Sequence, residues 1–288
     1  MNPILEVKNV NYIYSMGTPF QHQALADVSF SVNRGEFIGI IGHTGSGKST
    51  LMQQLNGLLK PTSGQILLDG EDIWADKKRT RQARFRVGLV FQYPEYQLFE
   101  ETVYKDIAFG PKNMGLDEKE IKQRVADAAR FVGLDPSMLG KSPFDLSGGQ
   151  KRRAALAGII AMRPEVLVLD EPAAGLDPMG RDAILSGICA YQKETGATII
   201  IVSHSMEDMA RYSDRLIVMN GGEIFMNGNC REVFSEADKL MSVGLDVPQI
   251  TKFMLALKSK GIDVRTDIFT VDEAKAEILS KMGGRGNA

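Results

Sequence analysis

The sequence has few of the features that mark secreted, membrane-spanning or nucleic-acid-binding chains. Its 288 residues contain two cysteines, Cys189 and Cys230, which fit neither a disulfide framework nor a metal knuckle. Apolar runs such as AALAGIIAM fall short of the roughly 18 residues that a membrane span needs. The N-terminus lacks the layout of a signal peptide, and a net charge of −2 provides no basic field for nucleic acid. We therefore expect a cytoplasmic protein without a nucleic-acid partner, whose membrane-spanning part, if any, is another polypeptide.

The hydrophobic patterning predicts an α/β fold. The first forty residues alternate like antiparallel strands, and FIGIIG at 37–42 is typical of a short buried strand. Strand and helix patterns alternate again from EVLVLDEP onward, after a mostly helical region at about 93–162. These patterns predict an N-terminal antiparallel β subdomain, a mainly parallel core and a helical insertion, together spanning 1–225. The remainder, 226–288, reads as a small helical appendage, with a capping box at Thr270 and Glu273.

A phosphate-binding loop follows the strand at 37–42. GHTGSGKST matches G-x-x-x-x-G-K-[ST], with a strand before it and a helical pattern after it. Glycines let the backbone N–H groups point inward at phosphates, and the helix N-terminus adds partial positive charge. Lys48 is expected to reach the β- and γ-phosphates, and Ser49 to ligate Mg²⁺. The candidate nucleotide-binding residues of the loop are Gly42, His43, Thr44, Gly45, Ser46, Gly47, Lys48, Ser49 and Thr50.

Two further strand ends carry candidate catalytic groups. EVLVLDEP is an apolar strand that ends in Asp170, which can hold Mg²⁺ through water, and Glu171, which can deprotonate the attacking water. Without the phosphate loop, the simpler interpretation would be two solvated carboxylates. ATIIIVSHS ends a third apolar strand with His204. A lone histidine is more often structural, but this one is predicted to lie beside a phosphate site.

LSGGQKRR supplies a second phosphate cradle. Ser147 is a natural N-cap, Gly148 and Gly149 leave backbone amides accessible, and a helical pattern follows. An ordinary capped helix would explain S-G-G alone. It does not explain LSGGQ between a phosphate loop and an acidic strand end, nor why one chain has two cradles for one triphosphate.

These motifs, with Gln92 after a strand and GLDP after VLVLDEP, resemble the ATP-binding subunits of ABC transporters over about residues 4–225. The resemblance implies a head-to-tail ATPase dimer, with ATP between the phosphate loop of one subunit and LSGGQ of the other. It implies that Gln92 senses the γ-phosphate and Mg²⁺, that Asp177 lies at the dimer interface and that His204 holds the γ-phosphate and positions Glu171. Tyr14 resembles the aromatic that stacks on adenine, and nearby Tyr12 stays an alternative. Residues implied to contact the partner's nucleotide are Ser147, Gly148, Gly149 and Gln150.

The segment FQYPEYQLFEETVYKDIAFGPKNMG, residues 91–115, is similar to the corresponding segment of energy-coupling factor (ECF) transporters, and EPAAGLDP resembles their second type of ATPase subunit. This resemblance implies an importer of vitamins or transition-metal ions, with ATP and Mg²⁺ as cofactors and a peripheral position on the cytoplasmic face of the membrane. The implied partners are a second ATPase subunit, a membrane scaffold protein and a substrate-capture membrane protein. A heterodimer is favoured, a homodimer stays open, and 226–288 resembles a region that strengthens ATPase pairing.

The same segment is expected to present a docking surface. Prolines at 94 and 111 are expected to stop regular structure at either end, leaving aromatic and acidic side chains exposed. The residues expected to contact the scaffold are Tyr93, Glu95, Tyr96, Gln97 and Phe99. The alternative function is a soluble ABC ATPase that serves a cofactor-assembly or regulatory complex.

Overall fold

The computed structural model describes residues 3–283, which divide into two compact units. Unit 1 comprises residues 3–36 and 49–202, and unit 2 comprises residues 37–48 and 203–283. The phosphate loop crosses from unit 2 into unit 1, and helix α1 (Lys48–Leu55) has its first residue in unit 2 and the others in unit 1.

Unit 1 contains the predicted antiparallel subdomain. Its strands are paired in the order β2-β1-β4-β5, with bounds Leu5–Tyr14 for β1, His22–Val32 for β2, Ser63–Leu68 for β4 and Glu71–Asp72 for β5. Leu5 pairs with Val32 on one side and with Leu68 on the other. Asp69 and Gly70 form the predicted two-residue turn, both with positive φ (52° and 78°), as this hairpin type requires. The antiparallel prediction is confirmed.

Unit 1 also contains three parallel strands in the order β8-β7-β6. They are β6 (Val87–Val90), β7 (Val166–Asp170) and β8 (Thr198–Val202), and α6 (Pro178–Thr195) connects β7 to β8. Every residue of these strands is buried, which explains their continuously apolar sequences. Their carboxyl ends meet at one edge of the sheet, so the chain that follows each strand lies at this edge.

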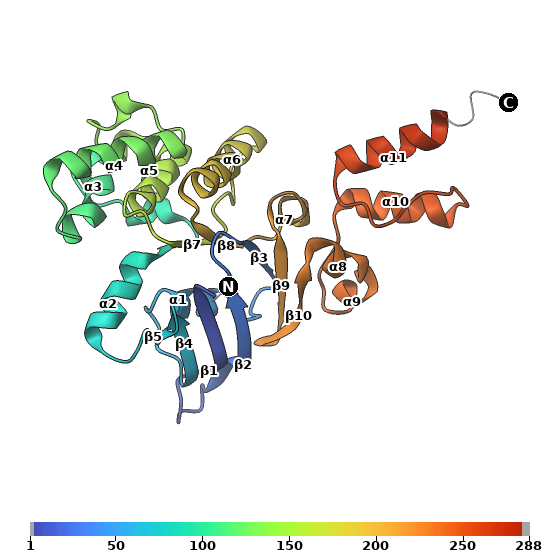
Figure 1. Cartoon of the computed structure of the whole chain (residues 1–288), viewed down its shortest axis with the longest axis horizontal. Coiled ribbons are helices and arrows are strands. Elements are labelled where there is room, and N and C mark those ends of the chain that lie inside the picture. Colours follow the sequence, from blue (N-terminus) through green and yellow to red (C-terminus); the bar gives the residue numbers. More distant parts are fainter. Residues whose placement is uncertain (1–2, 284–288) are drawn as a thin grey trace. The chain divides into compact units, whose positions relative to one another are not determined.

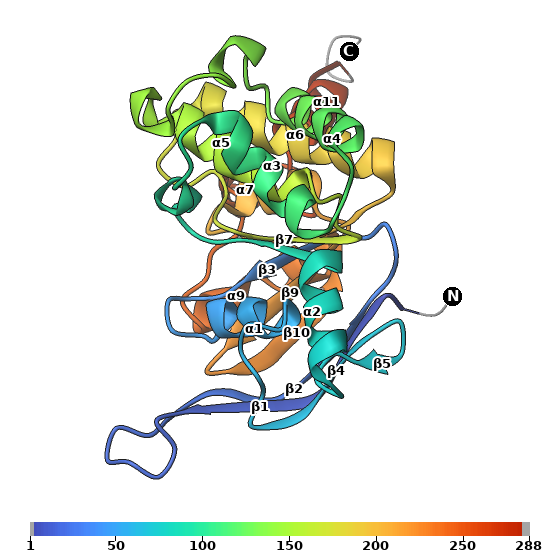
Figure 2. The ribbon, with the colours of Figure 1, turned by 90° about the vertical axis from the view of Figure 1, so that its left-hand side faces the viewer.

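The predicted helical insertion is confirmed within unit 1. Its elements are η1 (Pro94–Gln97), α3 (Val103–Asn113), α4 (Glu118–Phe131), η2 (Pro136–Met138), η3 (Pro143–Asp145) and α5 (Gly148–Ile160). Helices α3, α4 and α5 lie side by side (Figures 1 and 2). The prediction for Pro111 is wrong, because this proline lies inside α3 and the helix continues to Asn113. Pro111 lacks the N–H that would bond the Ile107 carbonyl, so α3 loses one hydrogen bond there without ending.

Helix α2 (Lys77–Arg86) was not expected from the sequence. Asp76 caps its N-terminus by accepting a hydrogen bond from the backbone N–H of Arg79. The helix buries only Thr80 and Ala83, so it has no apolar stripe that a periodicity search would detect.

Unit 2 has its own strands, in the order β10-β9-β3. They are β3 (Phe37–Ile41), β9 (Arg215–Asn220) and β10 (Glu223–Asn229), and the short helix α7 (Met206–Tyr212) precedes β9. Strands β3 and β9 are parallel, whereas β9 and β10 form an antiparallel hairpin.

The appendage consists of α8 (Cys230–Ser235), α9 (Ala237–Ser242), α10 (Gln249–Ser259) and α11 (Val271–Gly283). The predicted boundary at 225/226 falls within β10. Met254, Val264, Ile268 and Ala274 form a small apolar core. Thr270 Oγ1 accepts from the Glu273 N–H, and the Glu273 carboxylate accepts from the Thr270 N–H, so the predicted capping box is present.

Candidate functional site

The phosphate loop forms a tight curl in front of α1. Gly45 and Gly47 have φ of 82° and 98°, values that only glycine adopts without strain. The ammonium of Lys48 is buried inside the curl and donates to the carbonyl oxygens of Gly42 (2.7 Å) and His43 (2.8 Å). The lysine charge is therefore held at the centre of a loop whose backbone suits phosphate binding.

The structure brings two predicted Mg²⁺ ligands into contact within unit 1. Ser49 is the second residue of α1, and its hydroxyl donates to Asp170 Oδ2 at 2.9 Å. Among residues 3–283, no group of three or more His, Cys, Asp or Glu could hold a metal ion. A hydroxyl and a carboxylate oxygen side by side nevertheless fit Mg²⁺, which is bound in nucleotide sites by few protein oxygens together with phosphates and water.

Glu171 follows Asp170 with the backbone in the left-handed region, at φ 51°. Its N–H donates to the carbonyl of Val202, at the end of β8. Non-glycine residues adopt this conformation at a cost, and such strain is concentrated at functional sites. His204 follows β8 by two residues and precedes Ser205, the N-cap of α7.

Gln92 is exposed and follows β6 by two residues. The next residue, Tyr93, also has positive φ (56°) and redirects the chain into η1. Glu95 points inward, where its carboxylate accepts two hydrogen bonds from the Arg152 guanidinium, at 2.7 and 3.0 Å. Glu95 therefore lies outside the exposed part of the segment.

LSGGQ and GLDP lie together at an open cleft of about 700 Å³ in unit 1. Ser147 caps α5 in a capping box with Gln150, and Asp177 caps α6 by accepting from the Gly180 N–H. Of the residues predicted for the partner's nucleotide, three line the cleft: Ser147, Gly149 and Gln150. Asp177, predicted for the dimer interface, lines it too. Gly148 is the first residue of α5. Arg153, which sequence analysis did not single out, also lines the cleft and adds positive charge.

Tyr14 and Tyr12 lie edge to face, with ring centroids 4.7 Å apart. Only Tyr14 is tied to the phosphate-loop helix, through a 3.1 Å hydrogen bond between its hydroxyl and that of Thr50. Burial, with a smaller contribution from Tyr14, raises the pKa of Tyr12.

Sequence analysis did not predict one hydrogen-bonding partner of the phosphate loop. His43 Nε2 lies 2.9 Å from Asn220 Oδ1, at the end of β9, and the Gly222 N–H donates to the Ser46 carbonyl. A Cβ on Gly42 would lie 2.5 Å from the Met219 carbonyl oxygen. The β9–β10 turn thus fixes the back of the loop, and no local pattern around Asn220 signals this.

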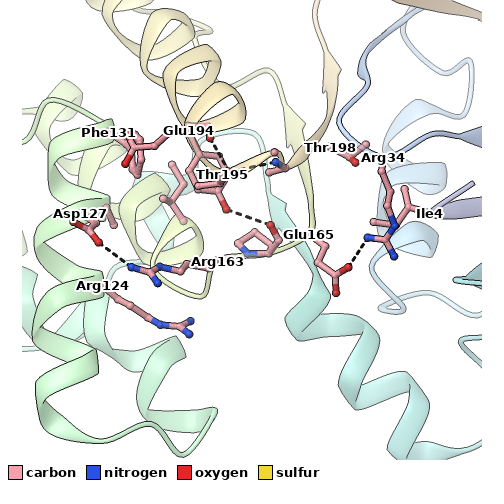
Figure 3. A pocket seen from close by; sticks show the side chains of 16 residues that line it. Ile4, Arg34, Arg124, Asp127, Phe131, Arg163, Glu165, Glu194, Thr195 and Thr198 are labelled. Carbon is pink, nitrogen blue, oxygen red and sulfur yellow. Dashed lines mark hydrogen bonds and ion pairs between the residues drawn. The ribbon is translucent and has the colours of Figure 1, made fainter.

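Another cavity, of about 490 Å³, is lined by charged residues of unit 1 and contains none of the predicted site residues (Figure 3). Its three arginines are all paired: Arg163 with Asp127 at 2.9 Å, Arg34 with Glu165 at 2.9 Å and Arg124 with Glu120 at 2.7 Å. Hydrogen bonds from arginines lower the pKa of Glu165 despite its partial burial. The Asp127 and Glu165 ion pairs join the residues just before β7 to α4 and to Arg34.

Comparison with known proteins identifies the family. The phosphate loop, the Ser49–Asp170 contact and the LSGGQ cleft define a phosphate-loop ATPase of the ABC class. The family model "ABC transporter" matches residues 25–174, and that of an AAA domain, putative AbiEii toxin of type IV toxin–antitoxin systems, matches residues 140–209.

Two relatives carry the name energy-coupling factor transporter ATP-binding protein EcfA2. The protein of Caldanaerobacter subterraneus subsp. tengcongensis is 55% identical over 283 residues, 98% of this chain and 99% of the relative. The protein of Clostridioides difficile is 56% identical over 282 residues, covering 97% and 98%.

Solved structures agree. CbiO1 from Clostridium perfringens, part of the ABC transporter complex cbiONQ, superposes with a TM-score of 0.75 at 43% identity, covering 88% of this chain and 100% of that one. An ATP-binding cassette in a dimeric post-hydrolysis state with ADP and phosphate gives a TM-score of 0.72 at 28% identity, covering 78% and 98%.

The chain belongs to the energy-coupling factor transporter ATP-binding proteins of the ABC transporter family. It is an ATP-hydrolysing transport subunit, so the fold and family predictions are confirmed and the soluble-complex alternative is not favoured. Across residues 3–283, no helix is long and apolar enough to span a membrane.

Proposed function

We propose that ATP is bound by the phosphate loop and hydrolysed with Glu171 as general base, and that this drives import of a vitamin or transition-metal ion. The contact between Ser49 and Asp170 carries the proposal, because it joins the loop to the strand end that presents Glu171. Lys48 supplies positive charge to the phosphates, Gln92 and His204 contact the γ-phosphate, and Tyr14 stacks on adenine. The hydroxyl bond to Thr50 favours Tyr14 over Tyr12.

Mg²⁺ fits the oxygen pair of Ser49 and Asp170, with Gln92 as a further ligand and Asp170 acting through water. When bound there, the ion would neutralise charge on the β- and γ-phosphates. The LSGGQ cleft would receive the nucleotide of a second ATPase subunit, with Asp177 at the interface.

Glu171→Gln tests the assignment. The amide preserves size but cannot accept a proton, so ATP turnover should fall about 10²–10⁴-fold while ATP binding persists. Steady-state phosphate release and nucleotide titration measure the two quantities. Glu194→Gln, an exposed position paired with Arg130, is the matched control. Near-normal turnover in Glu171→Gln would remove Glu171 from the role.

The membrane scaffold is proposed to dock at an apolar groove of about 340 Å³ beside η1. Phe99 and Phe109 meet edge to face there, with ring centroids 5.0 Å apart. Phe99 is 62% exposed and nearby Tyr96 is 85% exposed, so both rings are accessible to a partner. A partner helix with apolar and basic residues would fit the groove, which also contains Asp106. With a scaffold docked there, the subunit would lie on the cytoplasmic face of the membrane, in a complex that also contains a substrate-capture protein.

Replacing Tyr96 and Phe99 together by Ala should abolish scaffold binding and transport while the isolated subunit stays folded and binds ATP. Co-purification from detergent-solubilised membranes measures scaffold binding. Phe225→Ala, a change at an exposed aromatic in β10, should leave scaffold recovery unchanged. Full recovery with the double variant would place the docking site elsewhere.

A further inference from the structure

Helix α2 carries a strongly basic surface that none of the functions above uses. Its sequence KKRTRQARFR contains six lysine or arginine residues and no acid, in a chain whose net charge is −2. Positive charge concentrated in this way costs stability through self-repulsion, so its location calls for a partner of opposite charge.

Half of these cations are engaged within the protein. Arg79 lies near Glu71 and Asp76, Arg84 donates twice to the Gly57 carbonyl, and Arg86 binds Glu165. The other three are Lys77, Lys78 and Arg81. They are exposed, and within residues 3–283 none of them forms an ion pair.

The three unpaired cations share one face of α2. Lys77, Lys78 and Arg81, at positions i, i+1 and i+4, lie within about a third of the helix circumference and form the basic row. Arg84, at i+7, extends this row along the helix. Thr80 and Ala83 bury the opposite face. In Figure 2, α2 faces the viewer, and no other helix among the described residues of unit 1 is drawn in front of it.

The basic row lies close to the proposed scaffold groove. Phe85, one helical turn after Arg81, lines that groove, and the Arg81 guanidinium lies 5.9 Å from the Phe85 ring centroid. If a membrane protein occupies the groove, the row lies beside the structure that enters the bilayer. The row has no exposed apolar residue that could insert deeply, so its contact with a bilayer would be electrostatic.

We propose that Lys77, Lys78 and Arg81 bind the anionic phospholipid headgroups of the membrane beside the scaffold. The inference rests on the proposed peripheral position of the subunit. Each lysine or arginine near an anionic surface strengthens binding about fivefold, and the attraction acts within a Debye length of about 8–10 Å. Three residues together should therefore strengthen adsorption by about 10²-fold.

Vesicle sedimentation of the full chain tests this, with phosphatidylcholine alone and with phosphatidylcholine mixed with phosphatidylglycerol. Binding should rise with the phosphatidylglycerol fraction and fall with salt. The triple variant Lys77→Gln, Lys78→Gln, Arg81→Gln should bind mixed vesicles about 10²-fold more weakly, with unchanged ATP turnover. The control replaces Lys119, Lys122 and Lys193 by Gln. This removes the same charge from exposed positions outside α2 and should have a much smaller effect.

Equal loss in both triple variants would overturn the proposal, because only net charge would then matter. Binding that is independent of phosphatidylglycerol would also overturn it. A third arm uses heparin as a soluble polyanion: an α2 variant that loses heparin binding but keeps vesicle binding would assign the surface to another partner. Because the vesicles contain no scaffold protein, the result does not depend on whether the groove is correctly assigned.

Discussion

At the residue scale, the ion pair of Glu95 and Arg152 links three parts of the ATPase site. Arg152 belongs to the LSGGQ helix, Glu95 to the segment after Gln92, and Arg152 also donates to the carbonyl of Ala174, three residues beyond Glu171. The Arg152 side chain is 5% exposed and that of Glu95 16%. One guanidinium therefore joins the segment after Gln92, the LSGGQ helix and the chain beyond Glu171.

Arg152→Ala should lower the free energy of unfolding by about 3–5 kcal/mol, because it leaves the Glu95 carboxylate buried without its cation. Urea denaturation measures the loss. Arg130→Ala breaks an exposed pair with Glu194 and should cost about 0–1 kcal/mol. Similar losses of unfolding free energy in both variants would show that the buried pair stabilises the protein no more than the exposed pair does.

The same pair predicts a pH dependence. Burial has the largest single effect and raises the pKa of Glu95, but the Arg152 hydrogen bonds, a backbone hydrogen bond and the Arg152 charge together outweigh it and hold the pKa below its ordinary 4.5. A carboxyl group whose pKa is lower in the folded than in the unfolded protein stabilises the fold at pH values above its unfolded pKa. This contribution is lost as the pH falls through the pKa of the folded state. The stability difference between wild type and Arg152→Ala should therefore narrow in acid.

At the element scale, the β9–β10 turn holds the phosphate loop. Asn220→Ala removes the side-chain contact with His43, a neutral hydrogen bond worth about 1 kcal/mol, so ATP affinity should fall about fivefold. Calorimetric titration measures it. Asn227→Ala, on the same hairpin but bonded to Arg215, should bind ATP like wild type. Equal affinities in the two variants would show that the turn does not support the loop.

The elements that could be predicted from the sequence were those with a local signal. Strands buried on both faces, the Asp69–Gly70 turn and the phosphate loop each carry their pattern within a few residues. Helix α2 was missed because it buries only two small side chains. The path of the chain through Pro111 was predicted wrongly because a proline indicates the end of a helix, whereas α3 continues past it with the loss of one hydrogen bond. The partners of Arg152 and Asn220 were missed because long-range contacts leave no periodic trace.

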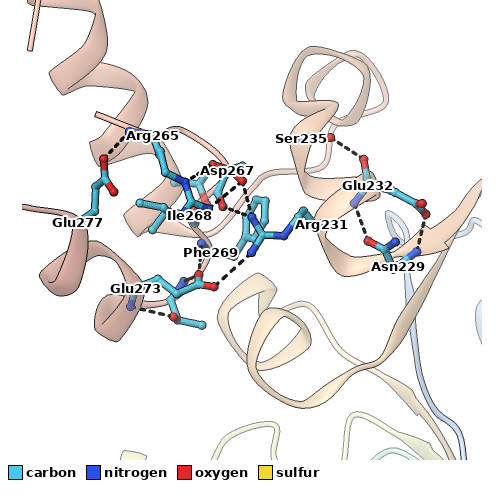
Figure 4. A network of polar contacts seen from close by, with 12 residues as sticks. Asn229, Arg231, Glu232, Ser235, Arg265, Asp267, Ile268, Phe269, Glu273 and Glu277 are labelled. Carbon is cyan, nitrogen blue, oxygen red and sulfur yellow. Dashed lines mark hydrogen bonds and ion pairs between the residues drawn. The ribbon is translucent and has the colours of Figure 1, made fainter. Parts of the chain in front are cut away.

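At the scale of the whole molecule, we propose that exposed apolar side chains of the appendage take part in pairing of the ATPase subunits. Asp267 accepts from both Arg231 and Arg265, and Arg231 also reaches Glu273 at the start of α11 (Figure 4). This network and the Met254 core hold α10 and α11 in place, so the exposed apolar side chains on them are not needed for folding.

Replacing exposed Phe253 and Leu279 together by Ser should therefore weaken pairing of the ATPase subunits and leave the appendage folded. Burial of a large apolar side chain contributes about 1.5–3 kcal/mol, so losing even part of two such contributions should weaken association about 10²-fold. Sedimentation with the co-purified second ATPase subunit, in ATP and on a Glu171→Gln background, measures the constant. Met241→Ser, at an exposed position on α9, is the control. The LSGGQ cleft and Asp177 lie in unit 1, which does not contain the appendage, so the double variant leaves them intact. Unchanged association in the double variant would therefore mean that pairing depends on the cleft and not on the appendage.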